Sequence, residues 1–407
     1  MAVLIAGASL AGLTAAEALR AEGFDGDVIV VDPSTALPPD RPPLSKQVLS
    51  GEWPAERAQH RLADKLSGLN LDLRLGVAAV SLDAAERVVG LSDGTSVKAD
   101  GIVIATGSSP RRLPGPDLLG VHVLRDLEDC IALRNDLDAG PSRVAVIGAG
   151  FIGAEVAATC RSLGLDVTMI EAGPVPLGRV LPGQIGSFIA DLHTDNGVEV
   201  RLGVGVSGLT HDGSGGASGD GARVTGVEMA DGSRVEAEVV VVGIGVTLNT
   251  EWLEGSGLTL DNGVVCDETC LAAPGIVAAG DLATWHNHFY GQKMRVEQWE
   301  NAIEQGEHAA KRLLAELGHG EPTAFRTVPW FWSDQYDLKM QMAGMPSGTD
   351  EVFIPVGSLE ERRFVAMFRR GDKCSAVLGV SRPRQVMLVR MKLRESLDWD
   401  NAMSVFA

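Results

Sequence analysis

Two glycine-rich segments have the residue types and spacing that bind the pyrophosphate of a dinucleotide. The first contains Gly7, Ser9 and Gly12, and Asp32 ends the next apolar run. The first glycine permits a tight turn, the amides that begin the helix bind pyrophosphate, and the acid accepts hydrogen bonds from a ribose. Serine replaces the usual middle glycine, but it is small enough for a pyrophosphate to approach. On its own, this motif also fits a tight turn that binds nothing.

The second segment has the complete pattern, Gly148, Gly150 and Gly153, and Glu171 ends the following apolar run. An acid at this position binds the adenosine ribose 2′-hydroxyl and repels a 2′-phosphate, so the motif favours NADH over NADPH. Arg179 is the nearest downstream cation and would weaken that preference if it reached the same ribose.

Both motifs must lie between a strand and a helix to bind a dinucleotide. The apolar pattern predicts a strand before each motif, a helix after it and a second strand, which is a βαβ unit. The predicted strands are 3–6, 27–32, 143–147 and 166–171, and the helices end near Leu19 and Leu163.

The remaining sequence predicts a further α+β region. The polar, glycine-rich segment 211–222 indicates a hairpin tip between two strands. After a linker at 318–322, the sequence alternates in short strand-like runs such as 363–368 and ends in a helix that begins near Pro383. A buried strand at 238–242 and a helix at 302–317 precede the linker.

Composition excludes several classes of protein. With 35 basic and 54 acidic residues, the formal net charge is −19, which argues against non-specific nucleic-acid binding and against an anionic membrane surface as partner. The five cysteines are odd in number and irregularly spaced, so they indicate no disulfide framework. We expect no metal site.

The N-terminal segment does not have the pattern of a targeting signal. It lacks a basic start, Glu17 interrupts its apolar run, and the first dinucleotide motif passes through it. The sequence also contains no stretch long and apolar enough to span a membrane. We therefore expect a cytoplasmic protein.

Two further turns give the sequence a family resemblance. Ala105-Thr106-Gly107 follows one predicted strand, and Gly280-Asp281 follows another. With the two motifs, they resemble the flavoproteins that have two dinucleotide-binding domains and the glutathione-reductase fold. The resemblance implies bound FAD and diffusing NADH, with Asp281 holding the ribityl chain at a helix start. Asp281 could instead only cap a helix.

The segment Arg41-Pro-Pro-Leu-Ser45-Lys46 resembles the ferredoxin-reductase branch, in which it lies against the flavin. Disulfide reductases have a cysteine pair near this position and peroxidase-type relatives have one cysteine, whereas this chain has Ser45. The resemblance implies that Lys46 lies near the reactive edge of the flavin, paired with Glu155, and stabilises negative charge on the reduced ring. The alternative is a surface lysine after a Pro-Pro turn.

Two aromatic segments strengthen the resemblance. Glu297-Gln298-Trp299 resembles the segment that covers the pyrimidine end of the flavin, and the run 329–335 resembles the start of the C-terminal domain in ferredoxin reductases that serve oxygenases. Its Trp330 and Trp332 suit partner docking or a wall beside the flavin, although each tryptophan could be core. The remaining candidate cofactor contacts are Leu10, Ala11, Arg125, Phe151, Ile152, Gly245 and Ala302.

Together these features predict an α/β protein with two Rossmann-like domains and a C-terminal α+β domain. Residues 1–108 and 244–320 would bind FAD, 109–243 would bind NAD, and 321–407 would form the C-terminal domain. The resemblance implies that FAD accepts a hydride from NADH and passes single electrons to two-iron two-sulfur ferredoxins. Lys46 and Glu155 are the candidate catalytic residues.

The downstream oxygenase and the class of acceptor have alternatives. The run 334–344 resembles reductases that feed a bacterial haem-thiolate monooxygenase, cytochrome P-450; Rieske-type aromatic-ring dioxygenases and rubredoxin are the other possibilities. A direct NADH oxidase or small-molecule reductase is a rival from another class. A redox-signalling flavoprotein that resembles apoptosis-inducing factor is a second rival.

The segment 355–395 has ten basic and four acidic residues in an otherwise acidic chain. An acidic ferredoxin would associate slowly with an acidic reductase unless the reductase presented a local positive surface. We therefore expect this basic segment, with Arg369, Arg370 and Arg382, to contribute to docking. The alternative is an ordinary solvated surface.

Overall fold

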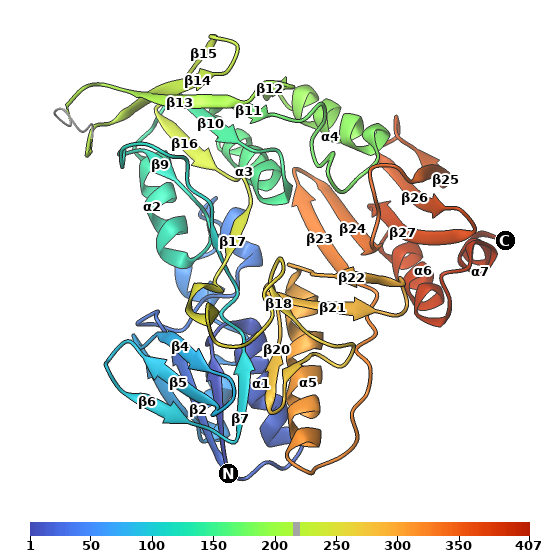
Figure 1. Cartoon of the computed structure of the whole chain (residues 1–407). Helices are drawn as coiled ribbons and strands as arrows, with labels where there is room; N and C mark the ends of the chain where they lie inside the picture. The colour runs from blue at the N-terminus through green and yellow to red at the C-terminus, as the bar shows by residue number, and fades with distance from the viewer. Residues whose placement is uncertain (215–219) are drawn as a thin grey trace. The chain divides into compact units, whose positions relative to one another are not determined.

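The structure, a computed structural model, describes residues 1–214 and 220–407 (Figure 1). These residues form two compact units. Unit 1 contains Met1–Asp40, Gln59–Ser109 and Thr247–Phe331; unit 2 contains Arg41–Ala58, Pro110–Val246 and Trp332–Ala407. The three-domain division stays a prediction, because it groups residues by the cofactor they would bind and not by compactness.

Unit 1 is built on a largely parallel sheet with strand order β19-β20-β7-β1-β2-β3. Its central strands are continuous apolar runs because both faces are covered, and Val3, Leu4 and Ile5 are completely buried. The carboxyl ends of β1, β2 and β7 therefore lie at one edge, where the glycine turns follow. The strands are β1 (Ala2–Ala6), β2 (Asp27–Asp32), β3 (Asp72–Leu75), β7 (Gly101–Ile104), β19 (Leu271–Ala273) and β20 (Ile276–Ala278).

Helices α1 (Leu10–Ala21) and α5 (Trp299–Glu316) pack closely against each other in unit 1. A Cβ added at Gly306 would lie 2.5 Å from the carbonyl oxygen of Ala11, so the glycine lets the two backbones meet. α5 therefore fixes the first turn of α1, which contains Gly12, the last glycine of the first dinucleotide motif.

Short sheets and turns complete unit 1. The chain passes between the units within β8 (Ser108–Pro110) and β17 (Val246–Leu248). The other strands of unit 1 are β4 (Ala79–Asp83), β5 (Val88–Leu91), β6 (Ser96–Lys98), β18 (Val264–Val265), β21 (Ala283–Asn287) and β22 (Gln292–Met294).

A second parallel sheet, with strand order β12-β11-β10-β16-β9, forms the centre of one part of unit 2 (Figure 1). Val144 and Val146 of β10 belong to a core cluster with α2 and α3, whereas Ala145 and Ile147 belong to a second cluster with β13, β14 and β15. This alternation explains why the strand is apolar at every position from Val144 to Ile147. The elements are α2 (Leu127–Asp138), α3 (Phe151–Ser162), β9 (Val121–His122), β10 (Arg143–Ile147), β11 (Asp166–Glu171), β12 (Glu199–Leu202), β13 (Val206–His211), β14 (Val224–Met229), β15 (Arg234–Glu236) and β16 (Val239–Val242).

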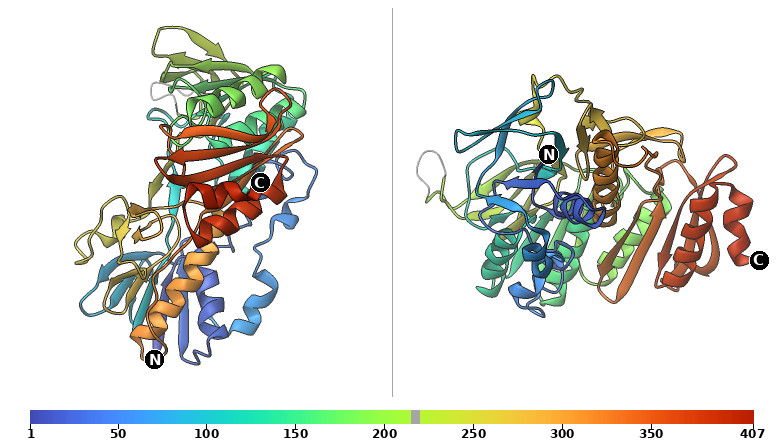
Figure 2. Two further views of the ribbon diagram at one scale, coloured as in Figure 1. Left: turned by 90° about the vertical axis from the view of Figure 1, so that its right-hand side faces the viewer. Right: turned by 90° about the horizontal axis from the view of Figure 1, so that it is seen from below.

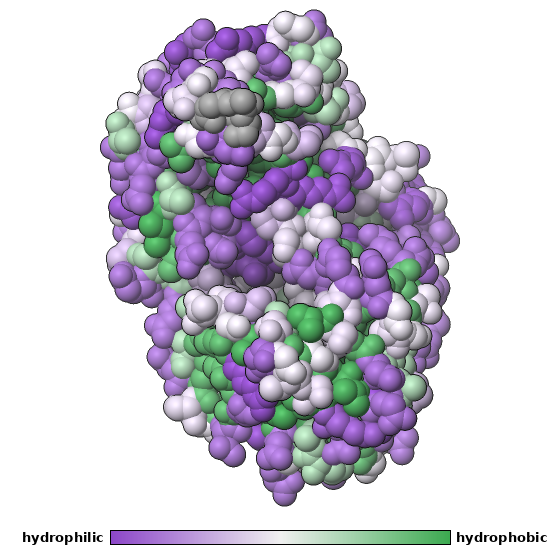
Figure 3. All heavy atoms as spheres, turned by 60° about the vertical axis from the view of Figure 1, so that its left-hand side comes forward, coloured by the Kyte–Doolittle hydropathy of each residue, from purple (hydrophilic) through white to green (hydrophobic). Residues whose placement is uncertain are grey.

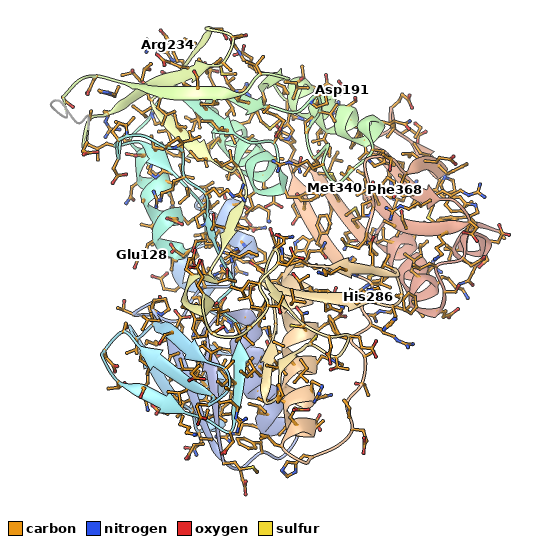
Figure 4. The ribbon with its side chains drawn as sticks, in the orientation of Figure 1. Glu128, Asp191, Arg234, His286, Met340 and Phe368 are labelled. Atoms are coloured by element: carbon orange, nitrogen blue, oxygen red, sulfur yellow. The ribbon has the colours of Figure 1, made fainter. Side chains whose placement is uncertain are left out.

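The last part of unit 2 is a sheet of order β23-β24-β27-β26-β25, with α6 packed on β24 and β27 (Figure 2). Met340 of β24 and Phe368 of β26 are buried in it (Figure 4). Helix α4 joins this sheet through an edge-to-face contact of Phe188 with Phe364, whose ring centroids are 5.1 Å apart. The elements are α4 (Gly183–Asp195), β23 (Trp330–Gln335), β24 (Leu338–Gly344), β25 (Glu351–Ser358), β26 (Arg363–Arg370), β27 (Lys373–Val380), α6 (Pro383–Glu395) and α7 (Trp399–Met403).

Most elements predicted from the sequence agree with these bounds, and the differences lie at element ends. The helix expected from Ala302 begins at Trp299, three residues earlier, because the polar residues that precede Ala302 form its first turn. β13 and β14 pair antiparallel, as expected for a hairpin across 211–222, but residues 215–219 of that segment lie outside the described residues.

The exposed large hydrophobic side chains are scattered over several elements. On the face drawn in Figure 3, hydrophobic residues lie among hydrophilic ones. Ile152, at the start of α3, is 46% exposed, although the rest of that helix is mostly buried. In the described parts of the chain, no helix is long and apolar enough to cross a membrane.

The contact between α1 and α5 leads to a test of the fold. We expect Gly306→Ala to destabilise the protein by about 1–3 kcal/mol, because its Cβ would overlap the Ala11 carbonyl. The measurement is the midpoint of thermal unfolding. Gly183→Ala is the control, since a Cβ at this helical glycine has open space; an equal loss in both variants would contradict the argument.

Candidate cofactor-binding and redox site

The first glycine turn holds its acidic residue through the backbone. The amide of Ala8 donates to Asp32 Oδ2 at 2.7 Å, and the amide of Ser34 donates to Oδ1 at 2.9 Å. None of the described side chains caps α1, and its first turn has no acidic residue. By contrast, Asp126 and Asp129 form a capping box on α2. The amides that begin α1 are therefore available to a pyrophosphate.

Glycine is required where this turn meets its neighbours. Gly7 has a φ of +111°, and a Cβ there would overlap the Ala105 carbonyl; a Cβ at Gly12 would overlap the carbonyl of Gly7. A Cβ at Gly280 would lie 3.1 Å from the Cβ of Ala11. The structure thus brings the first motif, the Ala-Thr-Gly turn and the Gly-Asp turn together in unit 1.

Asn249 fixes the Ala-Thr-Gly turn. Its side chain donates to the Thr106 carbonyl at 2.9 Å, and the Thr106 hydroxyl donates to the Asn249 carbonyl at 2.8 Å. The amide of Asn249 also donates to the Gly107 carbonyl at 3.0 Å. These three hydrogen bonds hold the turn in its place.

Asp281 accepts a hydrogen bond from the Ser108 hydroxyl at 2.6 Å. The chain continues from Asp281 into strand β21, so the expectation that this residue lies at a helix start and caps it is wrong. Arg295 donates to the Asp281 carbonyl at 2.8 Å and pairs with Glu297 at 2.6 Å. The Asp281 side chain is half-buried.

Trp299 is a polar anchor at the start of α5 and not simply a core residue. Its indole N–H donates to Asp40 Oδ1 at 2.6 Å. Burial raises the pKa of Asp40, and the hydrogen bond from Trp299 opposes that rise. Gln298 precedes the helix and is half-buried, whereas Ala302 is buried in it.

The second glycine turn, in unit 2, repeats the geometry of the first. The amide of Ala149 donates to Glu171 Oε2 at 2.9 Å, and the amide of Gly173 donates to Oε1 at 2.8 Å. Cβ atoms at Gly148 and Gly153 would overlap backbone carbonyls, whereas one at Gly150 would meet no described atom within 4 Å. The protein itself therefore does not require glycine at 150, and the open space fits a bound pyrophosphate.

The surroundings of this turn fit a nucleotide as well. No described side chain caps α3. Phe151 is half-buried and Ile152 is exposed at the start of the helix.

Lys46 and Glu155 form an ion pair in unit 2. Lys46 Nζ lies 2.9 Å from Glu155 Oε2, and the two side chains are only 11% and 8% exposed. The alternative of a surface lysine is therefore wrong. The hydroxyl of Ser45 donates to the same Oε2 at 2.5 Å, and that of Ser333 donates to Oε1 at 2.8 Å.

The remaining candidate contacts are distributed over both units. Arg41, Arg125 and Trp332 belong to unit 2 and Trp330 to unit 1, and all four are half-buried. Gly245 is exposed, with a φ of +100°. The candidate FAD contacts therefore come from both units.

The cysteines do not supply redox chemistry. All five are free and buried. Burial raises the pKa of Cys130 to about 11 and those of Cys160, Cys266 and Cys374 to about 12, and it raises the pKa of Cys270 well above its ordinary value. At neutral pH each side chain is a protonated thiol, which is a poor nucleophile.

Comparison with known proteins identifies the family. The family described as pyridine nucleotide-disulphide oxidoreductase matches residues 1–306, and the one described as reductase C-terminal matches residues 330–404. The chain belongs to the pyridine nucleotide-disulphide oxidoreductase family. Its members bind FAD and NAD(H), so the two cofactors expected from the sequence are confirmed.

Ferredoxin reductases are similar to this chain over nearly its full length. Putidaredoxin reductase of Pseudomonas putida is 35% identical over 98% of this chain and 94% of its own. The ferredoxin–NAD(+) reductase subunit of a benzene 1,2-dioxygenase system, from the same species, is 37% identical over 95% and 90%. The solved covalent complex of putidaredoxin reductase with putidaredoxin is 34% identical, with a TM-score of 0.89 over 97% and 93%.

These matches confirm the predicted family, enzyme class and fold. The chain is a flavoprotein oxidoreductase of the ferredoxin–NAD(+) reductase type, with mixed α/β sheets, Rossmann-like domains and a C-terminal domain.

Some residues of the site could not be found from the sequence. Ser333 lies in the run 329–335 and Asn249 lies in the range 244–320, but a serine or an asparagine at these positions carries no spacing signal. Asp40 and Ser108 bind Trp299 and Asp281 through contacts between elements far apart in the sequence. Only Ser45 had a signal, because it stands where relatives have cysteine.

The geometry of Glu171 predicts coenzyme preference. We expect the wild type to prefer NADH and Glu171→Arg to shift preference toward NADPH, because the change removes repulsion of the 2′-phosphate and adds a cation. A charged hydrogen bond is worth roughly 1–3 kcal/mol, or about ten- to a hundredfold in the ratio of kcat/KM values.

Steady-state assays with both coenzymes measure this ratio. Glu128→Arg, an equal charge change at an exposed residue of α2 (Figure 4), is the control and should leave the preference unchanged. A wild type that preferred NADPH would show that Glu171 does not select the coenzyme.

Proposed function

We propose that this protein transfers electrons from NADH through bound FAD to a two-iron two-sulfur ferredoxin. The observation that carries the proposal is the buried Lys46–Glu155 pair with Ser45 at its side, where disulfide reductases would place a reactive cysteine. A family member without a reactive thiol must hand its electrons to an external acceptor. Ferredoxin reductases similar over nearly the whole chain support ferredoxin as that acceptor.

In this proposal the protein supplies binding and electrostatics. Bound FAD would accept two electrons from NADH and release them singly, which is chemistry that no amino-acid side chain provides. Asp32 would bind the adenosine ribose of FAD, Asp281 its ribityl chain, and the amides that begin α1 its pyrophosphate. Lys46 would stabilise negative charge on the reduced ring, and Glu155 would hold the lysine.

The division of the chain between cofactors is part of the same proposal. Residues 1–108 and 244–320 would hold FAD and 109–243 would hold NADH, with Glu171 on its ribose. Residues 321–407 would form the C-terminal domain. The two glycine turns support this division. One lies in residues 1–108 and the other in residues 109–243, and each is followed by a helix whose first amides no described side chain caps.

We further propose a bacterial cytochrome P-450 as the final recipient of the electrons. The run 334–344 supports this choice, since it resembles reductases of haem-thiolate monooxygenases. The benzene dioxygenase reductase is similar to the same extent, so a Rieske-type dioxygenase is the alternative, and rubredoxin is an alternative acceptor. The reaction would take place in the cytoplasm, whose reducing conditions suit five free cysteines.

The proposal is tested by purification and reconstitution. We expect a yellow protein with one non-covalent FAD per chain, identified by absorbance and by mass analysis of the released cofactor. Candidate ferredoxins from the same genome, reduced with NADH and followed by their iron–sulfur absorbance, identify the partner. A colourless protein that takes up no FAD would contradict the proposal, and rapid turnover of NADH with oxygen alone would favour an oxidase.

Several arginines of the basic segment 355–395, which could attract a ferredoxin, already have partners within the protein. Arg370 pairs with the buried Asp350 at 2.8 Å, and Arg362 pairs with Asp195. The guanidinium of Arg369 stacks on Trp399, 5.2 Å from the ring centroid. Charge reversal at Arg369 or Arg370 would therefore damage the fold. Arg384, exposed in the first turn of α6, is a better probe.

We expect Arg384→Glu to raise the KM for ferredoxin about three- to tenfold at low salt, because it removes attraction of an acidic partner. The effect should shrink as salt rises. Arg234→Glu, on the exposed β15 (Figure 4), changes the net charge equally and is the control. Reduction of ferricyanide, which needs no docking, should be unaffected. Equal effects of both variants, or ferredoxin rates independent of salt, would place docking elsewhere.

A further inference from the structure

The Lys46–Glu155 pair is connected to a row of completely buried polar side chains in unit 2. Ser333 and Gln335 lie on β23 and His193 lies on α4, and none of the three is exposed to solvent. No pattern in the sequence predicts a role for any of the three. Burying three polar side chains in a row is costly unless each has a hydrogen-bond partner, so the arrangement needs an explanation.

The partners form one continuous chain. Ser333 Oγ donates to Glu155 Oε1 at 2.8 Å, and Gln335 Nε2 donates to Ser333 Oγ at 3.2 Å. His193 Nε2 lies 3.2 Å from Gln335 Oε1, and His193 Nδ1 lies 2.8 Å from the hydroxyl of Tyr336.

The donor and the acceptor of every hydrogen bond in this series are determined. The Oε1 atom of Gln335 can only accept, so His193 Nε2 must carry a hydrogen. Burial lowers the pKa of His193 to about 4, so the ring is neutral and Nδ1 accepts from Tyr336. Every donor therefore points toward Glu155, an orientation that stabilises a negative charge at that end.

Tyr336, the residue at the far end of this series of hydrogen bonds, has an unusual backbone conformation. Tyr336 has a φ of +56°, which bulky residues rarely adopt. Its ring packs edge-on against that of His193, with the ring centroids 5.4 Å apart. Asp191, which lies on α4 as His193 does, is exposed (Figure 4). The turn after β23 thus holds the tyrosine hydroxyl against the histidine.

We propose that Ser333, Gln335 and His193 are positioning residues that fix the Glu155 carboxylate, and through it the Lys46 ammonium group. Ser45 and Lys46 bind Oε2, and the chain from β23 binds Oε1, so both carboxylate oxygens are held from opposite sides. This series of hydrogen bonds does not carry protons, because the side-chain amide of Gln335 interrupts it. The role in electron transfer rests on the function proposed above.

The test uses the FAD-loaded protein and the redox equilibrium of its flavin. Glu155→Gln serves as reference, because it removes the charge that the chain stabilises. We expect Ser333→Ala to change the ratio of reduced to oxidised flavin, in a fixed redox-dye buffer, about two- to tenfold in the same direction as the reference. Gln335→Met should have a smaller effect, since it leaves the bond from Ser333 to Glu155.

The decisive measurement is the ratio of reduced to oxidised flavin in the double variant Glu155→Gln, Ser333→Ala. If Ser333 acts through Glu155, adding Ser333→Ala to Glu155→Gln changes the ratio no further. Ser375→Ala is the matched control: Ser375 is a buried serine of the same sheet that donates to the buried Asp350 at 2.6 Å. It should cost similar thermal stability and leave the flavin equilibrium unchanged.

The outcomes separate this inference from the proposed function. If Glu155→Gln shifts the equilibrium but Ser333→Ala and Gln335→Met do not, the chain has no positioning role. If Ser333→Ala has the same effect in both backgrounds, it acts by another route, which also overturns the inference. If Glu155→Gln itself leaves the equilibrium unchanged, the ion pair does not serve the flavin, and the proposed role of Lys46 falls with it.

Discussion

Close contact between glycines and backbone carbonyls is the constraint on which the rest of this structure depends. At Gly7 and Gly148 a side chain would overlap the carbonyl at the end of a neighbouring strand, and at Gly12 and Gly153 it would overlap the carbonyl of the first glycine. These contacts bring each helix directly onto the end of its sheet. No described side chain caps either helix, so the first helix amides are available to a pyrophosphate.

A second constraint acts on charge. The acids that end β2 and β11 are each held by two backbone amides, which fix the carboxylate without neutralising it with a cation. The buried carboxylate of Glu155 is treated differently, with a cation and two hydroxyls. The first arrangement leaves lone pairs for ribose hydroxyls, whereas the second fixes an ammonium group. In the proposed function, an acidic side chain would therefore bind a nucleotide in one place and position an ammonium group in another.

Sequence patterns were sufficient wherever the chemistry is local. A parallel strand buried on both faces must be apolar throughout, and a glycine turn must follow it, so β2, β10 and β11 could be predicted to the residue. The replacement of cysteine by Ser45 was also readable, because thiol chemistry requires that one atom. The helix expected at Asp281 was wrong because a carboxylate after glycine is compatible with a turn into a strand as well as with a helix start.

By itself, the sequence determined the two dinucleotide motifs, the acids that end the strands after them and the absence of a cysteine beside Lys46, since each depends on residues close together in the chain. Only the tertiary structure decided which side chains hold them. Ser333 reaches Glu155 across 178 positions, and Trp299 reaches Asp40 across 259. A single serine or aspartate gives no pattern in the sequence, because its partner is fixed by the packing of distant strands and helices and not by spacing along the chain.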